Sequence, residues 1–362
     1  MKIIVTQENL SKALNIVSRV ASTRTTLPVL NNILIRTDNN QLLLTATNLE
    51  IFIITSINTK ITKDGVAAVP ANLVTEFVSN LPKTNINLDI NDNKLKISAG
   101  NYNSTINTIS PDDFPDLPDS KPNVEFEIDS KLFKEAAAQT VLAASNDTTR
   151  PILTGVYFHT FEGILYMTAT DGYRLAERKL IAEKATIDSI IPTTTINEVV
   201  RVIDEVTEKI KISLSDDQII FEIGTIKIVS RLIDGNFINY RQLIPSKTEN
   251  SAILDKAEFM QTVKVAELFA RESAESIILK TDVAKQVISV SSIASEFGEN
   301  SSEIEGEIKG DASITLNAKY LLAALGAVEG DKVKFNFSGK LAPSLVTGEN
   351  DNYKHIIMPV KS

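Results

Sequence analysis

The chain of 362 residues contains no cysteine. Without thiols it can form neither a disulfide scaffold nor a thiolate zinc site, and it offers no cysteine nucleophile. No apolar run approaches the roughly 20 residues that span a bilayer. The first ten residues, MKIIVTQENL, hold only a short apolar run, and we expect neither a signal peptide nor an anchor there. The sequence therefore predicts a cytoplasmic protein that does not bind membranes.

Residues for catalysis are equally scarce. The two histidines, His159 and His355, each lie in an alternating apolar run, which is typical of strand residues rather than catalysts. The chain has no P-loop, dinucleotide fingerprint or HExxH motif. TATDGYRL, residues 168–175, places a glycine between an acid, an aromatic and an arginine, but Asp-Gly is first a turn signal, and Asp171 has only Arg174 as a basic partner. We predict no catalytic site, no metal and no cofactor.

Positive charge is also in deficit. Lysine and arginine number 37 against 46 acidic residues, a net charge of −9. This balance argues against a protein that grips nucleic acid tightly, because such binding relies on neutralising phosphates. It does not exclude a protein that surrounds a duplex loosely. With 43% apolar and 23% charged residues the chain is an ordinary globular protein, and its length predicts two or three domains.

What the sequence does contain is internal repetition. TTLPVLNNILI aligns with TTRPILTGVYF, which places Pro28 against Pro151 at an offset of 123 (151 − 28). TATN and TATD follow at the same offset. A more divergent third copy aligns IPTTTINEVVRVI, from Ile191, with ITLNAKYLLAALGAV, from Ile314, again 123 apart. Repetition at a fixed period indicates an array of similar units, here three units of about 121 residues.

Each unit has the same predicted order of elements. A short strand precedes a helix, a second helix follows a turn signal, and hairpin-like runs such as INLDINDNKLKISAG complete the unit. Two helices and roughly eight strands predict an α+β fold with the helices on one face of antiparallel sheets. Polar, Pro-bearing links then separate domains at 1–119, 120–247 and 248–362. The residues at helical spacing are Leu10, Leu14, Val17, Ala21; Phe133, Ala137, Val141, Ala144; and Phe259, Val263, Ala266, Ala270.

These motifs, in this order, resemble the bacterial DNA polymerase III beta subunit, the sliding-clamp family, over the whole chain. The stretches that carry the resemblance are LPVLNNILI, ATDGYRLA, DGNFINYRQLIP, LNAKYLLAAL and the final YKHIIMPVKS. The resemblance implies a non-enzymatic processivity factor whose two three-domain chains close head to tail around duplex DNA. The implied partners are a second copy, double-stranded DNA, the DNA polymerase III alpha subunit, other polymerases and the clamp loader.

Helix dimensions agree with a dimeric ring. If helices about 10 Å wide line the hole, six helices leave roughly 9 Å and twelve leave roughly 28 Å. A duplex about 20 Å across passes only the larger hole. The same helices carry both charge signs, and the lining cations are equally well interpreted as solvated charges. The candidate DNA contacts are Arg24, which matches a family position near DNA, and Lys12, Arg19, Lys131, Lys134, Arg201 and Lys264.

The resemblance also answers what TATDGYRL does. In the family the matching segment helps form a hydrophobic pocket for short peptides from polymerases and other DNA enzymes. Ile238 and Gln242 depart from the Pro and Arg usual in the family, and the final VKS lacks the usual apolar ending. The implied pocket residues are Arg150, Leu153, Thr170, Gly172, Tyr173, Arg174, Leu175, Ile238, Gln242, Leu243, Asn317, Tyr320, Ser344, Val346, Met358, Pro359 and Val360.

The implied dimer interface joins the first unit of one chain to the third unit of the other. Matching positions place Ile106 on the first surface and Leu268 and Phe269 on the second, although the last two also fit a helix core. Two other functions stay open on the residues alone. One is an enzyme, and the other is a β-rich repeat adhesin or scaffold without a DNA role, which the helix pair in each unit disfavours.

Overall fold

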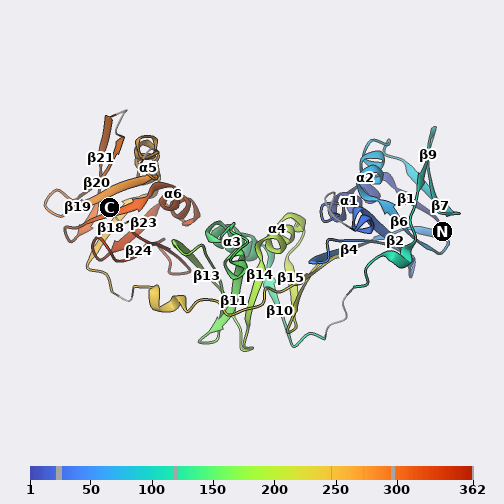
Figure 1. Ribbon diagram of the computed structural model, residues 1–362, viewed down its shortest axis with the longest axis horizontal. Helices are drawn as coiled ribbons and strands as arrows, with labels where there is room; N and C mark the ends of the chain where they lie inside the picture. The colour runs from blue at the N-terminus through green and yellow to red at the C-terminus, as the bar shows by residue number, and fades with distance from the viewer. Residues whose placement is uncertain (22–26, 118–120, 246, 272, 295–297, 361–362) are drawn as a thin grey trace. The chain divides into compact units, whose positions relative to one another are not determined.

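The computed structural model describes residues 1–21, 27–117, 121–245, 247–271, 273–294 and 298–360. Its described residues form three successive α+β repeats, each with two helices, as the sequence predicts (Figure 1). The first helix of each repeat directly follows a strand, and the second follows another strand later in the repeat. The helices are α1 (Gln7–Val17), α2 (Ala71–Ser79), α3 (Ser130–Thr140), α4 (Thr193–Val202), α5 (Lys256–Ala270) and α6 (Ala318–Ala327).

The strands follow the same order in each repeat. The first repeat contains β1 (Lys2–Thr6), β2 (Asn32–Asp38), β3 (Gln41–Thr47), β4 (Ile51–Asn58), β5 (Lys60–Lys63), β6 (Val66–Pro70), β7 (Asn85–Asn91), β8 (Lys94–Ala99) and β9 (Tyr102–Asn107). The second contains β10 (Val124–Asp129), β11 (Gly155–Phe161), β12 (Ile164–Thr170), β13 (Arg174–Ala182), β14 (Asp188–Pro192), β15 (Lys209–Leu214), β16 (Gln218–Ile223) and β17 (Ile226–Arg231). The third contains β18 (Asn250–Asp255), β19 (Ser276–Asp282), β20 (Val287–Ala294), β21 (Gly298–Lys309), β22 (Ser313–Asn317), β23 (Lys332–Phe337), β24 (Ser344–Thr347) and β25 (Tyr353–Ile357).

Amphipathic spacing and local caps explain the helices. In α5, Phe259, Val263 and Ala266 are buried along one face, which is the face that packs on β20 and β21. Asp255 caps the helix, its Oδ1 accepting from the Glu258 N–H at 2.8 Å. Asn317 caps α6 in the same way. A side-chain cap satisfies one backbone donor that the first turn of a helix leaves unpaired.

Two helices end earlier than their periodicity predicts. Spacing alone extends the first helix to Ala21 and the third to Ala144, but α1 ends at Val17 and α3 at Thr140. The chain continues from α3 as a single 3-10 turn, η3 (Val141–Ala143). Beyond the helix ends Ala21 is buried, whereas Val141 and Ala144 are half-buried, so the helical spacing continues past the point where the helix stops.

The sheets extend from one repeat into the next. All strand pairs are antiparallel, in sheets ordered β5-β1-β7-β8-β9, β10-β15-β16-β17-β4-β3-β2-β6 and β14-β11-β12-β13-β25-β24-β23-β18-β21-β20-β19-β22. The pair β4·β17 joins the first repeat to the second, and the pair β13·β25 joins the second to the third. The predicted α+β class with helices on antiparallel sheets is confirmed.

The chain forms two compact units, and the boundary between them divides the middle repeat. One comprises residues 1–130 and 197–232, and the other comprises residues 131–196 and 233–362. Each unit contains one of the two inter-repeat sheet junctions. The division follows from the pairing, because one sheet of the middle repeat belongs to the first repeat's layer and the other to the third repeat's layer. We call them the amino-terminal unit and the carboxy-terminal unit.

Candidate peptide pocket and charged helix faces

The TATDGYRL segment forms a tight turn between β12 and β13. The Asp171 carboxylate Oδ1 accepts from the backbone N–H groups of Tyr173, at 2.9 Å, and Arg174, at 3.0 Å. Thr170 Oγ1 accepts from the N–H of Gly172 at 3.0 Å. Gly172 has φ +92°, a backbone conformation that residues other than glycine rarely adopt. The interpretation of Asp171 as a turn residue rather than a catalyst fits this geometry.

The Arg174 side chain contacts two neighbouring side chains beside this turn. Its Nε lies 3.0 Å from the Asp171 carboxylate, and its guanidinium carbon lies 4.5 Å from the centre of the Tyr320 ring. The turn borders a hollow of about 300 Å³ in the carboxy-terminal unit. Arg174 therefore presents to that hollow a charge already paired with Asp171, which is less attractive to a carboxylate than a free cation would be. The hollow is lined by Ala144, Ser145, Asn146, Arg150, Asp171, Tyr173, Arg174 and Tyr320.

An apolar cluster lies beneath the residues after the turn. Leu175, Tyr240, Leu345 and Ile356 are buried together, with Phe237 packed against them. These residues come from β13, η5 (Tyr240–Leu243), β24 and β25. Three strands and the short 3-10 helix thus share one buried apolar cluster, which we call the apolar floor; its four residues do not themselves line the hollow. Of this cluster the sequence pointed only to Leu175, because the other three come from strands and a helix whose facing was not evident.

The chain end runs alongside the turn. The Met358 N–H donates to the Tyr173 carbonyl at 2.8 Å, and the Val360 N–H donates to the Thr315 carbonyl at 2.9 Å. Met358, Pro359 and Val360 are half-buried. The predicted proximity of the final residues to TATDGYRL is therefore a feature of the backbone hydrogen bonding. Lys361 and Ser362 lie outside the described residues.

The remaining predicted pocket residues differ in how they can contact a ligand. Tyr173 is 61% exposed and stands at the rim. Ser344 and Val346 are fully buried, so they support the pocket from within. Asn317 uses its Oδ1 to cap α6, accepting from the Tyr320 N–H at 3.1 Å. The exposed group comprises Arg150, Ile238, Gln242 and Leu243, and Leu153 is half-buried.

Both histidines are buried strand residues, as predicted. His159 lies in β11 with its Nε2 2.7 Å from the Tyr240 hydroxyl, and His355 lies in β25 with its Nδ1 2.7 Å from the Tyr353 hydroxyl. Burial, helped by the nearby charge of Arg241, lowers the pKa of His159 to about 4. Burial, helped by Arg174, lowers the pKa of His355 to about 3. Both rings are therefore neutral near pH 7.

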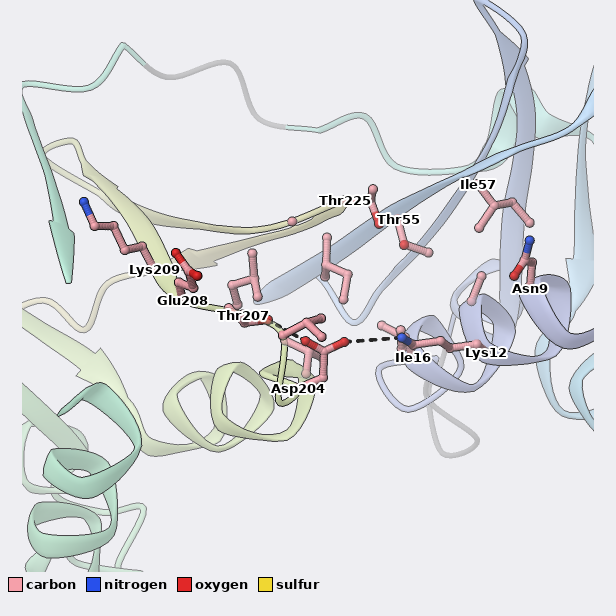
Figure 2. Close-up of a pocket in the computed structure, with 16 residues that line it drawn as sticks. Asn9, Lys12, Ile16, Thr55, Ile57, Asp204, Thr207, Glu208, Lys209 and Thr225 are labelled. Atoms are coloured by element: carbon pink, nitrogen blue, oxygen red, sulfur yellow. Dashed lines mark hydrogen bonds and ion pairs between the residues drawn. The ribbon is translucent and has the colours of Figure 1, made fainter. Parts of the chain in front are cut away.

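Several of the predicted DNA-facing cations are paired with acids. Lys12 on α1 lies 3.4 Å from Asp204, and Figure 2 shows this pair spanning a hollow of about 370 Å³ in the amino-terminal unit. Arg201 lies 2.6 Å from Glu198. All four side chains are solvent-exposed or near the surface, so the pairs are weak and open to exchange for a phosphate.

The other candidate cations lie on or beside first helices of their repeats. Arg19 and Lys264 are exposed, Lys131 is exposed and Lys134 is half-buried. Arg24 lies outside the described residues. The helices thus carry an interspersed pattern of both charge signs, as the sequence indicated.

The predicted dimer residues divide into two kinds. Leu268 on α5 is 57% exposed, and Phe269 is half-buried. Ile106 is only 5% exposed, because it lies on the inward face of β9 opposite Leu95. Alternation along β9 turns this side chain inward, so it offers little surface in a single chain, and its place at the dimer interface stays a prediction. The strand that carries it is nevertheless the last of its sheet.

Within the described part of the chain, no group of three or more histidine, aspartate or glutamate side chains is placed to hold a metal ion. The same residues include no helix long and apolar enough to cross a membrane.

Three successive α+β repeats, each with two helices, whose antiparallel sheets run from one repeat into the next, are the architecture of sliding clamps. Models of the amino-terminal, central and carboxy-terminal domains of the DNA polymerase III beta subunit match residues 1–118, 127–239 and 241–361. The chain belongs to the DNA polymerase III beta-subunit family. It is a non-catalytic sliding clamp, as the sequence predicted, and an enzyme or an adhesin is not favoured.

Full-length relatives support this assignment. The beta sliding clamp of Halalkalibacterium halodurans is 29% identical over 382 residues, covering 100% of both chains. That of Staphylococcus aureus is 30% identical over 363 residues, covering 96% of each. Among solved structures, the sliding clamp of Bacillus subtilis has a TM-score of 0.95 at 29% identity, covering 100% of this chain and 99% of that one. The Pseudomonas aeruginosa clamp bound to griselimycin has a TM-score of 0.95 at 26% identity, covering 100% of both chains.

Proposed function

We propose that two copies of this chain close head to tail around duplex DNA, and that the pocket at TATDGYRL receives short peptides from the DNA polymerase III alpha subunit, other polymerases and the clamp loader. In this role the clamp would act in the cytoplasm, where it would tether replication enzymes to DNA. The family membership supports the DNA and polymerase partners in general. The residue-level arrangement rests on the sheet junctions and on the pocket described above.

The repeated sheet junction is the observation that carries the ring. At the first junction Thr55 of β4 lies opposite Ile226, the first residue of β17. At the second, Arg178 of β13 lies opposite Tyr353, the first residue of β25. Thr55 and Arg178 are 123 residues apart, which is the repeat offset of the sequence, so the two junctions share one register.

At each end of the described chain, one strand that corresponds to a member of this junction has an unpaired edge. Among described residues, β9 pairs only with β8, and the 298–305 segment of β21 pairs only with β20. These are the first-repeat counterpart of β17 and β25 and the third-repeat counterpart of β4 and β13, strands that are paired on both sides. An unpaired strand edge is a template for another chain. Pairing β9 of one copy with β21 of the other would satisfy both edges, and head-to-tail contacts of this kind close into a ring.

The shared register predicts which residues meet. Thr55 and Arg178 lie opposite Leu44 and Met167 within their own hairpins, and Ser302 lies opposite Val290 at the corresponding place in β21. The first residue of β9 is Tyr102. We therefore place Tyr102 of one copy opposite Ser302 of the other.

Because the chain has no cysteine, this register can be tested by cross-linking. The double variant Tyr102→Cys/Ser302→Cys should give a covalent dimer on mild oxidation, since directly opposite Cβ atoms lie within disulfide range. Tyr102→Cys/Ser301→Cys is the matched control, because residue 301 points to the other face of the strand. Equal cross-linking of both variants, or none in the first, would refute the proposed edge pairing.

The pocket is proposed to select short peptides with a Gln or similar polar residue followed by Leu or Phe anchors. Its support is the buried floor around Leu175 and the half-buried chain end at Met358, which together offer apolar contact with few polar groups. A solved relative holds a bound ligand, griselimycin, which is consistent with a ligand-binding clamp. Ile238 and Gln242 stand on its exposed side and are the positions where preference would differ from other family members.

A fluorescence titration tests the pocket directly. The probe is a labelled pentapeptide that begins with Gln and ends in Leu-Phe. Leu175→Ala/Met358→Ala, and separately deletion of Met358 to Ser362, should abolish binding while the dimer mass is retained. Because Leu175 is buried, the double variant should also unfold at a lower temperature, whereas the deletion should change thermal unfolding little. Gln242→Arg should change affinity by at most the value of one partly exposed charge-assisted bond, about 1.5 to 3 kcal/mol. Undiminished binding by the truncated protein would mean that TATDGYRL is only a turn and not part of a peptide site.

A further inference from the structure

We propose that Arg241 is a positioning residue for peptide binding: clamped between two aromatic rings and a buried carboxylate, it fixes the η5 wall so that Ile238 and Leu243 face the pocket. This inference rests on the proposed peptide-binding function. Arg241 itself would not touch the peptide. Its effect would be transmitted through the backbone of residues 238–243, whose exposed side chains would make the contact.

The partly buried Arg241 side chain contacts two aromatic rings and one carboxylate. Its guanidinium carbon lies 3.8 Å from the centre of the Phe161 ring and 4.5 Å from that of Tyr166. Its Nη2 lies 3.3 Å from Oε2 of Glu177. Neither Nε nor Nη2 forms a hydrogen bond to a described residue, so charge and ring stacking hold the group.

Glu177 ties η5 to the strand that builds the pocket floor. Its side chain is buried, at 3% exposure, and the same Oε2 accepts a hydrogen bond from the Tyr240 hydroxyl. Tyr240 in turn accepts from Thr168 at 3.1 Å and meets His159 at 2.7 Å. Two consecutive residues of η5, Tyr240 and Arg241, therefore converge on one carboxylate oxygen of β13.

A separate anchor is needed because η5 has little stability of its own. It is a single 3-10 turn without a side-chain cap. Ile238, just before η5, and Leu243, its last residue, are exposed and make no large core contribution. Glu177 lies two residues beyond Leu175 on the same face of β13, so this strand supplies both a residue of the apolar floor and the carboxylate that anchors η5.

The test is a double-mutant cycle on peptide affinity, using the whole dimeric protein and the labelled Gln to Leu-Phe pentapeptide. Arg241→Lys keeps the charge but loses the planar stacking, and we expect it to weaken binding about tenfold, as we expect for Leu243→Ala. If Arg241 acts by placing Leu243, the double variant should also lose about tenfold. A loss near a hundredfold, or unchanged binding by Arg241→Lys, would overturn the inference.

Two further variants keep the result interpretable. Phe161→Leu removes the aromatic ring nearest to Arg241. Because Phe161 is 40% exposed, this variant should fold even if Arg241→Lys does not, and it should bind the peptide severalfold more weakly. Lys179→Met is the matched control, since Lys179 is an exposed residue on the same face of β13 beyond Glu177, and it should bind normally. Unchanged affinity in Phe161→Leu would count against the positioning role. Absence of binding by the unaltered protein would instead refute the pocket itself.

Discussion

At the scale of residues, the same turn is built twice with different side chains. In the first repeat Asn48 Oδ1 accepts from the N–H groups of Glu50, at 3.0 Å, and Ile51, at 2.8 Å, just as Asp171 does in the second repeat. Leu49 then stands at the position of Gly172 and adopts φ +77°. The role of Asp171 and Gly172 could be predicted from sequence because Asp-Gly turns depend on local geometry. The sequence also pointed to Arg174 as the basic partner of Asp171, three residues away. The contact of Arg174 with Tyr320 could not be predicted, since it depends on a helix from another repeat.

Replacing the strained leucine should stabilise the protein. A bulky residue in the left-handed region costs about 1 to 2 kcal/mol, so Leu49→Gly should raise the free energy of unfolding by about 1 kcal/mol. Gly172→Leu should lower it by a similar amount, because a Cβ there meets no atom within 4 Å and only the backbone cost remains. Urea unfolding of the two variants measures both changes. A destabilised Leu49→Gly would mean that its apolar contacts outweigh the strain.

The buried histidines predict a loss of stability in mild acid. Their folded pKa values, about 4 for His159 and about 3 for His355, lie below the ordinary 6.5, so the unfolded chain binds more protons between those values. Stability is therefore fully present above pH 6.5 and falls as the pH drops through that window. At pH 5.5 each ring should cost about 1 kcal/mol relative to pH 7.5. Urea midpoints at the two pH values should show a drop that His355→Gln roughly halves; an unchanged drop in the variant would exclude His355 as a contributor.

At the scale of elements, periodicity predicted which segments are helices and which are hairpins, because both depend on residues close in the chain. It placed the ends of α1 and α3 about one turn too late, since buried apolar residues continue after the helical hydrogen bonding stops. The facing of edge strands was harder. Ile106 was expected at a surface, whereas pairing with β8 fixes its side chain inward. The apolar floor of the pocket was largely missed because four separate elements contribute one residue each.

The exposed end of α5 carries the prediction for dimerisation. Leu268→Ala/Phe269→Ala should give a folded monomer, because Leu268 is exposed and its removal leaves the buried stripe of Phe259 and Val263 intact. Sedimentation equilibrium at micromolar concentration should report the mass of a dimer for the unaltered chain and half that mass for the variant. The far-ultraviolet circular dichroism of both should agree. A variant that remains dimeric would remove these two residues from the interface.

At the scale of the whole molecule, a net charge of −9 and paired lining cations favour linkage over grip. Lys12 and Arg201 are each engaged by an acid, so a phosphate could bind them only by displacing that acid. A protein that must slide is served by weak, sequence-independent contacts. The threefold repeat and the family could be predicted from sequence because the motifs recur at one offset. The continuation of sheets across repeats could not, since it needs the pairing of β4 with β17 and of β13 with β25.

Retention on DNA of defined topology tests the central claim most directly. The protein, placed on closed circular DNA by its clamp loader, should co-elute with the circle on gel filtration at physiological salt and be released when one restriction cut linearises it. The Leu268→Ala/Phe269→Ala variant, which cannot close a ring, should not be retained on either form. Direct affinity for a short linear duplex should be weak and fall further as salt is raised. Equal retention on circular and linear DNA, or tight binding to the short duplex, would contradict a clamp that holds DNA by encircling it.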